Sequence, residues 1–299
     1  MSKKILVVYF SQSGQLQEIV ENFAAPFSAE GNQVEFYRVK MKKEFPFPWK
    51  SKNFFDAMPE SVLGIPAEVD EPVFKEEKYD LVVFAYQPWF LSPSIPSNSF
   101  LHNKEFQKRI HQTPVVTIIG ARNMWINAQE RVKKIIKQIG GNLVGNIVYT
   151  DRHNNFVSAV TIQYWMFTGK KDRWLGIFPE PGVNDMEINE AGKFGKIVLR
   201  ALSVNRFDDL QSQLLAENAV EPLTTLMFIE GRAPKIFSLW AKLISGKSNR
   251  ALWLQIFKYY LLFALFIIAP IILVIYLVLI MPFTGKRIRE RKKYFSGVN

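Results

Sequence analysis

The 299-residue sequence contains no cysteine and only three histidines. Without cysteine the chain can form no disulfide, no thiolate metal site and no cysteine nucleophile. His102, His111 and His153 are scattered along the chain, which argues against a metal site built from histidine. Catalysis by a Cys-His pair, such as a thiol-dependent condensation, is therefore excluded.

The sequence also lacks an excess of charge over most of its length, although its formal net charge is +11. From Gly231 onward there are 12 Lys and Arg residues and one acidic residue, Glu290, which leaves 26 basic and 26 acidic residues in the first 230. Proteins that bind nucleic acid carry a basic patch on the folded domain. The neutral N-terminal body therefore predicts no nucleic-acid partner.

The basic C-terminal part contains a long run without charge, from Tyr259 to Gly285. As a helix these 27 residues would be about 40 Å long, whereas the hydrocarbon core of a bilayer is roughly 30 Å thick. We predict a membrane segment over residues 251–285 and a basic tail over residues 286–299, with the lipid bilayer as partner. Because Pro270 divides the run and basic residues flank both ends, a single kinked span and a re-entrant helical hairpin both remain open.

Residues 206–250, upstream of this run, predict a linker followed by an amphipathic helix. The segment APKIFSLWAKLIS places its large apolar residues on one helical face and its two lysines elsewhere. The residues of that face are Ile236, Leu239, Trp240, Leu243 and Ile244. Such a helix is typical of the interface of an anionic membrane. The alternative is an ordinary surface helix of the globular domain.

The N-terminus reads as a buried strand, a polar turn and a helix. Every residue from Ile5 to Phe10 is apolar, which is typical of a strand of a parallel sheet buried on both faces. Apolar residues then recur at helical spacing from Leu16 to Phe23. The turn between them, Ser11 to Gly14, lies at the helix N-terminus, where free N–H groups bind anions. Its hydroxyl groups suit a single phosphate.

Further strands and helices alternate along the chain, which predicts an α/β fold with a doubly wound parallel sheet of five strands. We expect strands over 5–10, 32–40, 79–86, 113–120 and 141–149, and helices over 13–30, 99–111, 126–139 and 189–202. Ligands of such sheets bind at the carboxyl ends of the strands. The loops that follow the strands therefore form the predicted site.

The sequence resembles the flavodoxin family over its first 205 residues. The phosphate loop of that family is Ser/Thr-x-Thr/Ser-Gly-x-Thr; SQSGQL matches it at Ser11, Ser13 and Gly14 and departs from it at Leu16. The resemblance implies FMN as cofactor, bound by three loops. The implied binding residues are Ser11, Gln12, Ser13, Gly14, Gln15, Leu16, Gln87, Pro88, Trp89, Phe90, Gly120, Ala121, Arg122, Asn123 and Trp125.

Individual roles follow from the chemistry of these side chains. Trp89 and Phe90 are expected to stack on the flavin, and Gln87 and Asn123 to form hydrogen bonds with it. Arg122 would stabilise negative charge on the flavin or on an enolate oxygen, which makes it a candidate catalytic residue. The second catalytic candidate is His153, as a general acid or base; the alternative is a solvated loop histidine. Trp125 would wall the site, unless it and Trp89 pack against the next helix.

Two insertions exceed a minimal flavodoxin, at residues 41–64 and 160–182, and both are rich in aromatic residues. Long aromatic loops near an active face predict a lid over a hydrophobic substrate. A second small core or a dimer contact is the alternative for either insertion. Because every loop of the predicted pocket precedes residue 206, we expect the C-terminal part to be an anchor whose removal leaves the pocket intact.

A closer resemblance is carried by KKILVVYFSQSGQL, FPFPW, YQPWFLSPSIP and GARNMW together with the hydrophobic C-terminus. This combination is similar to the bacterial flavodoxin-like proteins of dialkylresorcinol biosynthesis, which are labelled condensing enzymes. It implies a flavin-dependent aromatase that acts beside a ketosynthase, at the bacterial inner membrane with the FMN domain facing the cytoplasm. An NAD(P)H:quinone oxidoreductase, with NAD(P)H or a quinone as redox partner, and a membrane-docked electron carrier remain as alternatives.

Overall fold

A computed structural model describes residues 2–299 and contains one five-stranded parallel sheet. Its strands, in spatial order, are β2 (Gln33–Arg38), β1 (Lys4–Tyr9), β3 (Leu81–Tyr86), β6 (Pro114–Ala121) and β7 (Asn142–Thr150). Taken in chain order, the strands therefore lie 2-1-3-4-5, which is the flavodoxin-like arrangement of a doubly wound sheet. The predicted fold class and all five predicted strands are confirmed.

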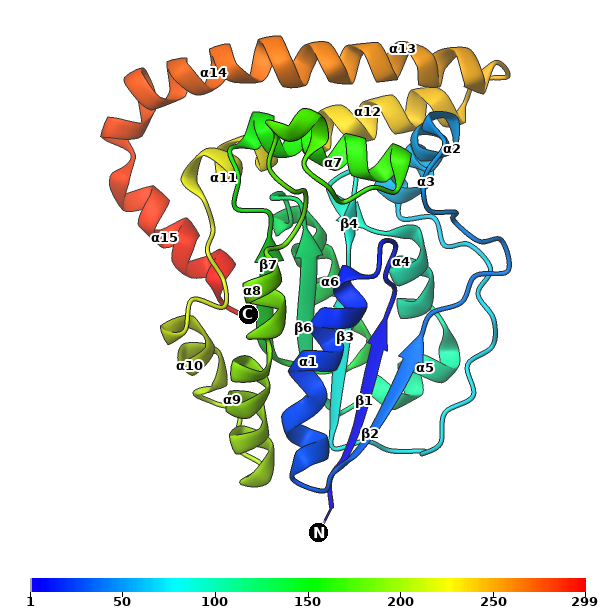
Figure 1. The fold of residues 1–299 in the computed structure, drawn as a ribbon, viewed down its shortest axis with the longest axis vertical. Helices are drawn as coiled ribbons and strands as arrows, with labels where there is room; N and C mark the ends of the chain where they lie inside the picture. Colours follow the sequence, from blue (N-terminus) through cyan, green and yellow to red (C-terminus); the bar gives the residue numbers. More distant parts are fainter. Residues whose placement is uncertain (1) are drawn as a thin grey trace.

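Helices cover both faces of the sheet (Figure 1). On one face lie α1 (Gln15–Ala29) and α9 (Gly192–Ser203), and on the other α5 (Lys104–Ile110) and α6 (Ile126–Ile139). Sandwiched between them, all six residues of β3 are buried, as expected for a strand without a polar face.

One predicted helix is interrupted in the structure. The helix expected over 99–111 is divided into α4 (Ile95–Leu101) and α5, because the side chain of Asn103 accepts a hydrogen bond from the Phe106 N–H and starts a new helix. The helix expected over 189–202 is present as α9, and the short helix α8 (Asp185–Asn189) precedes it.

The two aromatic insertions are largely helical rather than open loops. The first contains α2 (Ser51–Asp56) and α3 (Met58–Leu63), and α7 (Asn155–Thr168) reaches into the second, which continues with a short 3-10 turn at Trp174–Gly176. Phe55, Met58 and Val62 of the first insertion form a second, smaller core with C-terminal residues. Those C-terminal residues are Ala241, Ile244, Leu254 and Phe257. Residues 41–64 thus form part of a second core, as the alternative states, and they also supply Phe47, Trp49, Phe54 and Phe55 to a cavity at the ends of the strands, as the predicted lid would.

After α10 (Leu210–Ala216), α11 (Thr224–Glu230) and α12 (Ala233–Ser245), one continuous helix runs from Arg250 to Phe283; we call it the apolar helix. It comprises α13 (Arg250–Phe263) and α14 (Ala269–Ile275), which are separated by a π-helical turn at Ala264–Ile268. A second π-helical turn at Tyr276–Ile280 and a 3-10 turn at Met281–Phe283 follow α14. Among the described residues it alone is long and apolar enough to cross a membrane. The chain does not turn back at Pro270, so the hairpin is not present.

The apolar helix lies across the end of the domain at which the sheet strands terminate, above α12 and α7 (Figure 1). From its far end, α15 (Gly285–Ser296) returns along the side of the body. The predicted face of α12 is divided, since Ile244 is buried against α3 while Ile236 and Leu239 remain exposed. The tail thus contacts the body near both ends of the apolar helix and again through α15.

Candidate functional site

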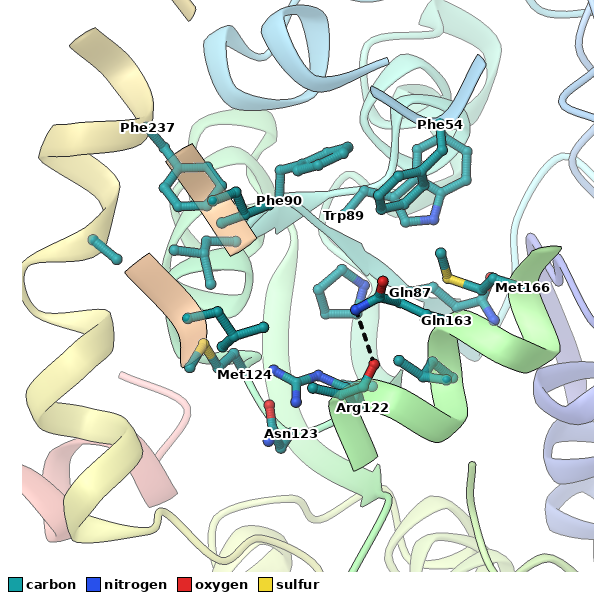
Figure 2. A pocket seen from close by; sticks show the side chains of 18 of the residues that line it. Phe54, Gln87, Trp89, Phe90, Arg122, Asn123, Met124, Gln163, Met166 and Phe237 are labelled. Carbon is teal, nitrogen blue, oxygen red and sulfur yellow. Dashed lines mark hydrogen bonds between the residues drawn. The ribbon is translucent and has the colours of Figure 1, made fainter. Parts of the chain in front are cut away.

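A cavity of about 490 Å³ lies at the carboxyl ends of the sheet strands. Its floor is formed by the turn between β1 and α1 and by the loops after β3 and β6. The rest of its wall comes from the first aromatic insertion, from α7, α11, α12 and the apolar helix, and from Gly182 and Val183. Figure 2 shows Arg122 and Asn123 at one end of the cavity and Phe54, Trp89, Phe90 and Phe237 at the other. The position agrees with the rule for ligands of doubly wound sheets.

The turn between β1 and α1 is organised by Ser11 and Gly14. Gly14 has a φ of 99°, in the left-handed region that favours glycine, and its N–H donates to the Ser11 hydroxyl at 3.1 Å. The N–H of Gln12 donates to Oε1 of Gln87 at 3.0 Å. Within residues 2–299, no acceptor contacts the N–H groups of Ser13, Gln15 or Leu16. These three amides, at the positive end of the α1 dipole, can bind an anion.

The departure from the family motif at Leu16 has a packing reason. Leu16 is 1% exposed, and a Cβ placed on Gly120 would lie 3.3 Å from its Cδ1. The leucine therefore packs α1 against Gly120 at the end of β6. Backbone amides, rather than this side chain, remain to bind a phosphate.

The segment around Gly182 lies against this turn. Val183 and Gln15 exchange two hydrogen bonds, from the glutamine Nε2 to the valine carbonyl at 2.9 Å and from the valine N–H to the glutamine Oε1 at 3.1 Å. Gly182 has a φ of 91°, and a Cβ there would lie 2.7 Å from Cζ3 of Trp165. Only glycine fits this close approach. Nothing in the sequence marked Gly182 as part of the site.

The loop after β3 is a tight hairpin of β4 (Pro88–Trp89) and β5 (Ser92–Pro93). Its turn residues Phe90 and Leu91 both have positive φ, at 48° and 63°, a conformation that costs bulky residues of order 1–3 kcal/mol each. The turn directs Trp89 toward the aromatic insertion, where its ring packs edge-on against Phe45 and Trp49, with centroids 5.1 and 5.2 Å away. Trp89 thus lines the cavity and also belongs to an aromatic cluster.

The loop after β6 places a buried cation against the cavity. Arg122 donates through Nη1 to the Asn155 carbonyl at 2.9 Å and to the Ser158 hydroxyl at 3.2 Å, and it forms no salt bridge with any of residues 2–299. Burial lowers the pKa of the Arg122 guanidinium to about 10, although the charge of Asp151 opposes the shift. Beside it, Asn123 is 7% exposed and its Oδ1 has no hydrogen-bond partner in the described chain. Such a cation is stabilised by an anionic or electron-rich ligand.

Most of the predicted cofactor-binding residues line this one cavity. They are Gln12, Ser13, Gln15, Leu16, Gln87, Pro88, Trp89, Phe90, Gly120, Ala121, Arg122 and Asn123. The sequence therefore brought the three loops together correctly, while four other predicted residues are placed elsewhere.

Ser11, Gly14, Trp125 and His153 do not line the cavity. Ser11 and Gly14 shape the turn from within. Trp125 is 3% exposed in the main core, as its packing alternative describes. The side chain of His153 is 42% exposed, and its Nδ1 lies 2.7 Å from Oδ1 of Asp151, which holds the ring beside that carboxylate. The expected acid–base role is not supported by this position.

Sequence reasoning missed the cavity wall contributed by α12 and the apolar helix, whereas the part of α7 that lines the cavity belongs mostly to the predicted lid at residues 160–182. Gln163 and Met166 come from α7, and Phe237 from α12 (Figure 2). The apolar helix adds Tyr260, Leu261, Leu262, Ala264, Leu265, Ile268, Ala269 and Ile272. A chain truncated after about Asn249 would lack this part of the wall, so the structure does not support the expectation that such a chain keeps an intact pocket and its FMN.

The lining contains no aspartate, glutamate or histidine, and its charged residues are Arg122 and Arg232. Among residues 2–299 there is also no group of three or more His, Cys, Asp or Glu side chains that could hold a metal ion. The cavity is apolar with a few convergent polar groups, which is typical of a site for a small organic ligand.

No family model matches the chain, and no curated protein matches it. Among solved structures, a flavoprotein from Lactobacillus acidophilus NCFM in complex with FMN is 18% identical, with a TM-score of 0.40 over 49% of this chain and 93% of its own. A flavodoxin from Archaea is 10% identical, with a TM-score of 0.35 over 67% and 99%. A flavone reductase is 11% identical, with a TM-score of 0.39 over 69% and 65%. The fold assignment rests on the strand order and not on these similarities.

Proposed function

We propose that this protein is an FMN-dependent oxidoreductase that acts on a hydrophobic cyclic ketone. The observation that carries the proposal is one apolar cavity that combines two features. The N–H groups at the start of α1 are free to bind an anion, and Arg122, which forms no salt bridge among residues 2–299, lies largely buried in the wall. The known structures described above include one flavoprotein in complex with FMN and a flavone reductase, which is consistent with this class.

The residues present fit FMN. The N–H groups of Ser13, Gln15 and Leu16 suit its phosphate, which is the group that a helix N-terminus binds best. The unpaired Oδ1 of Asn123 can accept from a ring N–H, and Arg122 can neutralise charge that develops on the ring or on a bound oxygen. Trp89 and Phe90 supply aromatic surface. FMN bound here would supply hydride transfer.

For the substrate, we propose aromatisation of a dialkyl cyclohexanedione to a dialkylresorcinol. The support is the set of motifs FPFPW, YQPWFLSPSIP and GARNMW, whose residues contribute much of the aromatic wall. The reaction removes one proton and one hydride from the ring, and FMN, when bound, would supply the acceptor for the hydride. The ketosynthase that would make the dione is the proposed protein partner.

Arg122 is the residue to which we assign charge stabilisation in this reaction. A cyclic 1,3-dione is a vinylogous acid that ionises readily, so its enolate can enter a cavity that lacks a carboxylate or histidine base. The guanidinium holds the negative oxygen, which the apolar surroundings make a stronger interaction than in water. Phe54, Phe237 and the apolar helix exclude water from the alkyl chains.

Quinone reduction is the second candidate, because a quinone also develops negative oxygen and also carries a hydrophobic chain. The same cavity and Arg122 would serve it, with NAD(P)H as the reductant. An electron carrier is less consistent with the structure, since a carrier presents its flavin edge to a partner whereas α7, α12 and the apolar helix enclose this cavity. We further propose that the enzyme works at the bacterial inner membrane with its body in the cytoplasm.

The decisive experiment purifies the full chain in detergent and measures flavin absorbance and FMN uptake by fluorescence titration. We expect a yellow protein, and loss of FMN retention in Gly14→Val, because a branched side chain is strained at positive φ and would distort the turn whose amides are proposed to bind the phosphate. Gly31→Val is the matched control: Gly31 also has a positive φ of 74°, but no atom lies within 4 Å of an added Cβ. A wild-type chain that takes up no FMN would refute the proposal.

The substrate is tested on the FMN-loaded protein under anaerobic conditions. A synthetic 2,5-dialkylcyclohexane-1,3-dione should bleach the flavin and yield one resorcinol per flavin reduced. Menaquinone with NAD(P)H is the competing assay. Turnover of the quinone without reaction of the dione would establish the second candidate in place of the first.

A further inference from the structure

The apolar helix is attached to the body near both of its ends. At the first end, the Arg250 guanidinium contacts Oδ1 of Asp56 at 2.9 Å and both carboxylate oxygens of Glu60 at 2.7 Å. One turn further, Leu254 is 7% exposed, and Phe257 is fully buried in the second core. This end is therefore held by an ion pair and by apolar packing.

The far end is held by different contacts. Tyr276 is 6% exposed and its ring stacks on Phe228 of α11, with centroids 3.8 Å apart. The chain then returns through α15, where the Tyr294 hydroxyl donates to Glu130 at 2.7 Å. The carbonyl of Ser296 accepts from Nε2 of Gln211 at 2.8 Å. These contacts reach α6, α10 and α11, so the far end returns to the domain that holds the first end.

A membrane-crossing orientation is incompatible with these attachments. The 34 residues from Arg250 to Phe283 make a helix about 50 Å long, and to cross a bilayer it must carry one end through roughly 30 Å of hydrocarbon. One folded domain cannot contact both ends from the two sides of a membrane. The contacts at one end would all have to break.

The side of the apolar helix that faces away from the body is a continuous apolar stripe. Its residues are spaced by three or four and each is 40–63% exposed. They are Leu252, Ile256, Tyr259, Phe263, Ile267, Ile271, Val274 and Val278. A stripe of this length in water is unfavourable, and in a soluble monomer it would be exceptional.

Exposed basic residues flank the apolar helix at both of its ends along the chain. Lys235, Lys242 and Lys247 of the α12 region and Lys286, Arg287 and Arg289 at the start of α15 are all exposed. Cations that border an apolar surface match the anionic headgroups that border the acyl layer, at about 1 kcal/mol per basic residue. The charge pattern therefore selects a lipid surface as the occupant.

We propose that this protein is monotopic: the apolar helix lies in the plane of one anionic leaflet, and both flanking basic clusters and the body stay on the same side of the membrane. The opposite side of the helix lines the cavity through Leu261, Leu265 and Ile268. One helix thus separates the acyl layer from the cavity. A lipid-soluble substrate would reach the site from the leaflet, a consequence that rests on the proposed function.

The test uses the natural absence of cysteine. Single cysteines are placed in the full chain at Ile256, Phe263, Ile271 and Val278, labelled with an environment-sensitive fluorophore and bound to vesicles of phosphatidylcholine and phosphatidylglycerol. Lipids brominated at shallow or deep acyl positions then report the depth of each label. We expect the same shallow depth at all four positions. A profile that is deep in the middle and shallow at the ends would overturn the proposal.

A second arm measures sidedness in intact bacterial cells that express the chain and in inverted vesicles from them. Cysteines at Ser203 on the body, at Ser248 and at Lys293 should react with a membrane-impermeant maleimide together or not at all. Reaction of Lys293→Cys on the side of the membrane opposite to Ser203→Cys would overturn the proposal. Release of the full-length chain from the membrane by high salt, or a full-length chain that stays soluble as an oligomer, would overturn it as well. Thermal unfolding checks that each variant is folded. Neither arm measures flavin binding, so a failure of the proposed function would not change these results.

Discussion

The strand β3 and the apolar helix are both almost free of polar residues, yet the molecule buries them to opposite extents. All six residues of β3 are buried between two layers of helix. In the most hydrophobic window of the apolar helix, only 6% of residues are buried. Apolar composition therefore identifies a segment that avoids water without identifying what covers it. In the body the cover is protein, and for the outer stripe of the tail we propose lipid.

Removing the tail tests whether body and tail are separate units. Of the changes proposed here, we expect this one to lower the stability of the protein most. Deletion of residues 250–299 removes Leu254 and Phe257 from the second core, at roughly 3–6 kcal/mol of stability for these two side chains. It also opens one wall of the cavity. The truncated protein should aggregate or unfold at much lower temperature and lose FMN. A monodisperse truncation with unchanged Tm would show that the tail is only an anchor.

Two phenylalanines of the apolar helix allow its body-facing side to be compared with its outer side. Phe257 is fully buried, so Phe257→Ala should lower the free energy of unfolding in detergent by about 3–5 kcal/mol. Phe263 is 55% exposed, so Phe263→Ala should change it by no more than about 0.5 kcal/mol. Denaturant unfolding measures both. Equal effects of the two substitutions would mean that the helix does not pack on the body through this face.

The sequence predictions succeeded for the body of the protein and were less complete for the tail. The strands could be predicted because runs such as Leu81–Tyr86 occur between turn signals, and the helix Ile126–Ile139 has the predicted bounds. The contacts of the tail could not be predicted, because the sequence of a helix that is apolar on all sides does not show which side packs on the protein. Within the site, the three loops were predicted from their positions after strands. His153 was misplaced because the carboxylate two residues earlier, Asp151, holds its ring.

Glu230 connects the start of the tail to the body through α6. Its buried carboxylate accepts hydrogen bonds from the N–H groups of Trp125 and Asn127, both at 3.1 Å, and so takes the place of an N-cap. Burial raises the pKa of Glu230 from its ordinary value of 4.5 to about 7, although these N–H groups favour the charged form.

A raised pKa means that the folded state binds this proton more tightly than the unfolded state. The stabilisation is complete below pH 4.5 and is lost as the pH rises to 7, with a slope of at most about 1.4 kcal/mol per pH unit. Glu230→Gln resembles the protonated form and should flatten this dependence between pH 5 and 7. Unfolding free energies over that range provide the measurement, and an unchanged slope in the variant would assign the dependence to other groups.

The smallest expected effect concerns the ion pair that ties the apolar helix to the first insertion. Arg250 bridges Asp56 and Glu60 at a partly exposed position, where solvent screening limits such a contact to about 1 kcal/mol. Arg250→Ala should therefore lower the free energy of unfolding by about that amount at low salt, and by less at high salt, because added ions screen the wild-type pair. Lys242→Ala is the control, since Lys242 is an exposed cation that forms no salt bridge among residues 2–299. A loss in both variants would reflect general charge, whereas a loss confined to Arg250→Ala would identify a specific contact between tail and body. No loss in either would leave apolar packing around Phe257 as the contact that holds this end of the helix.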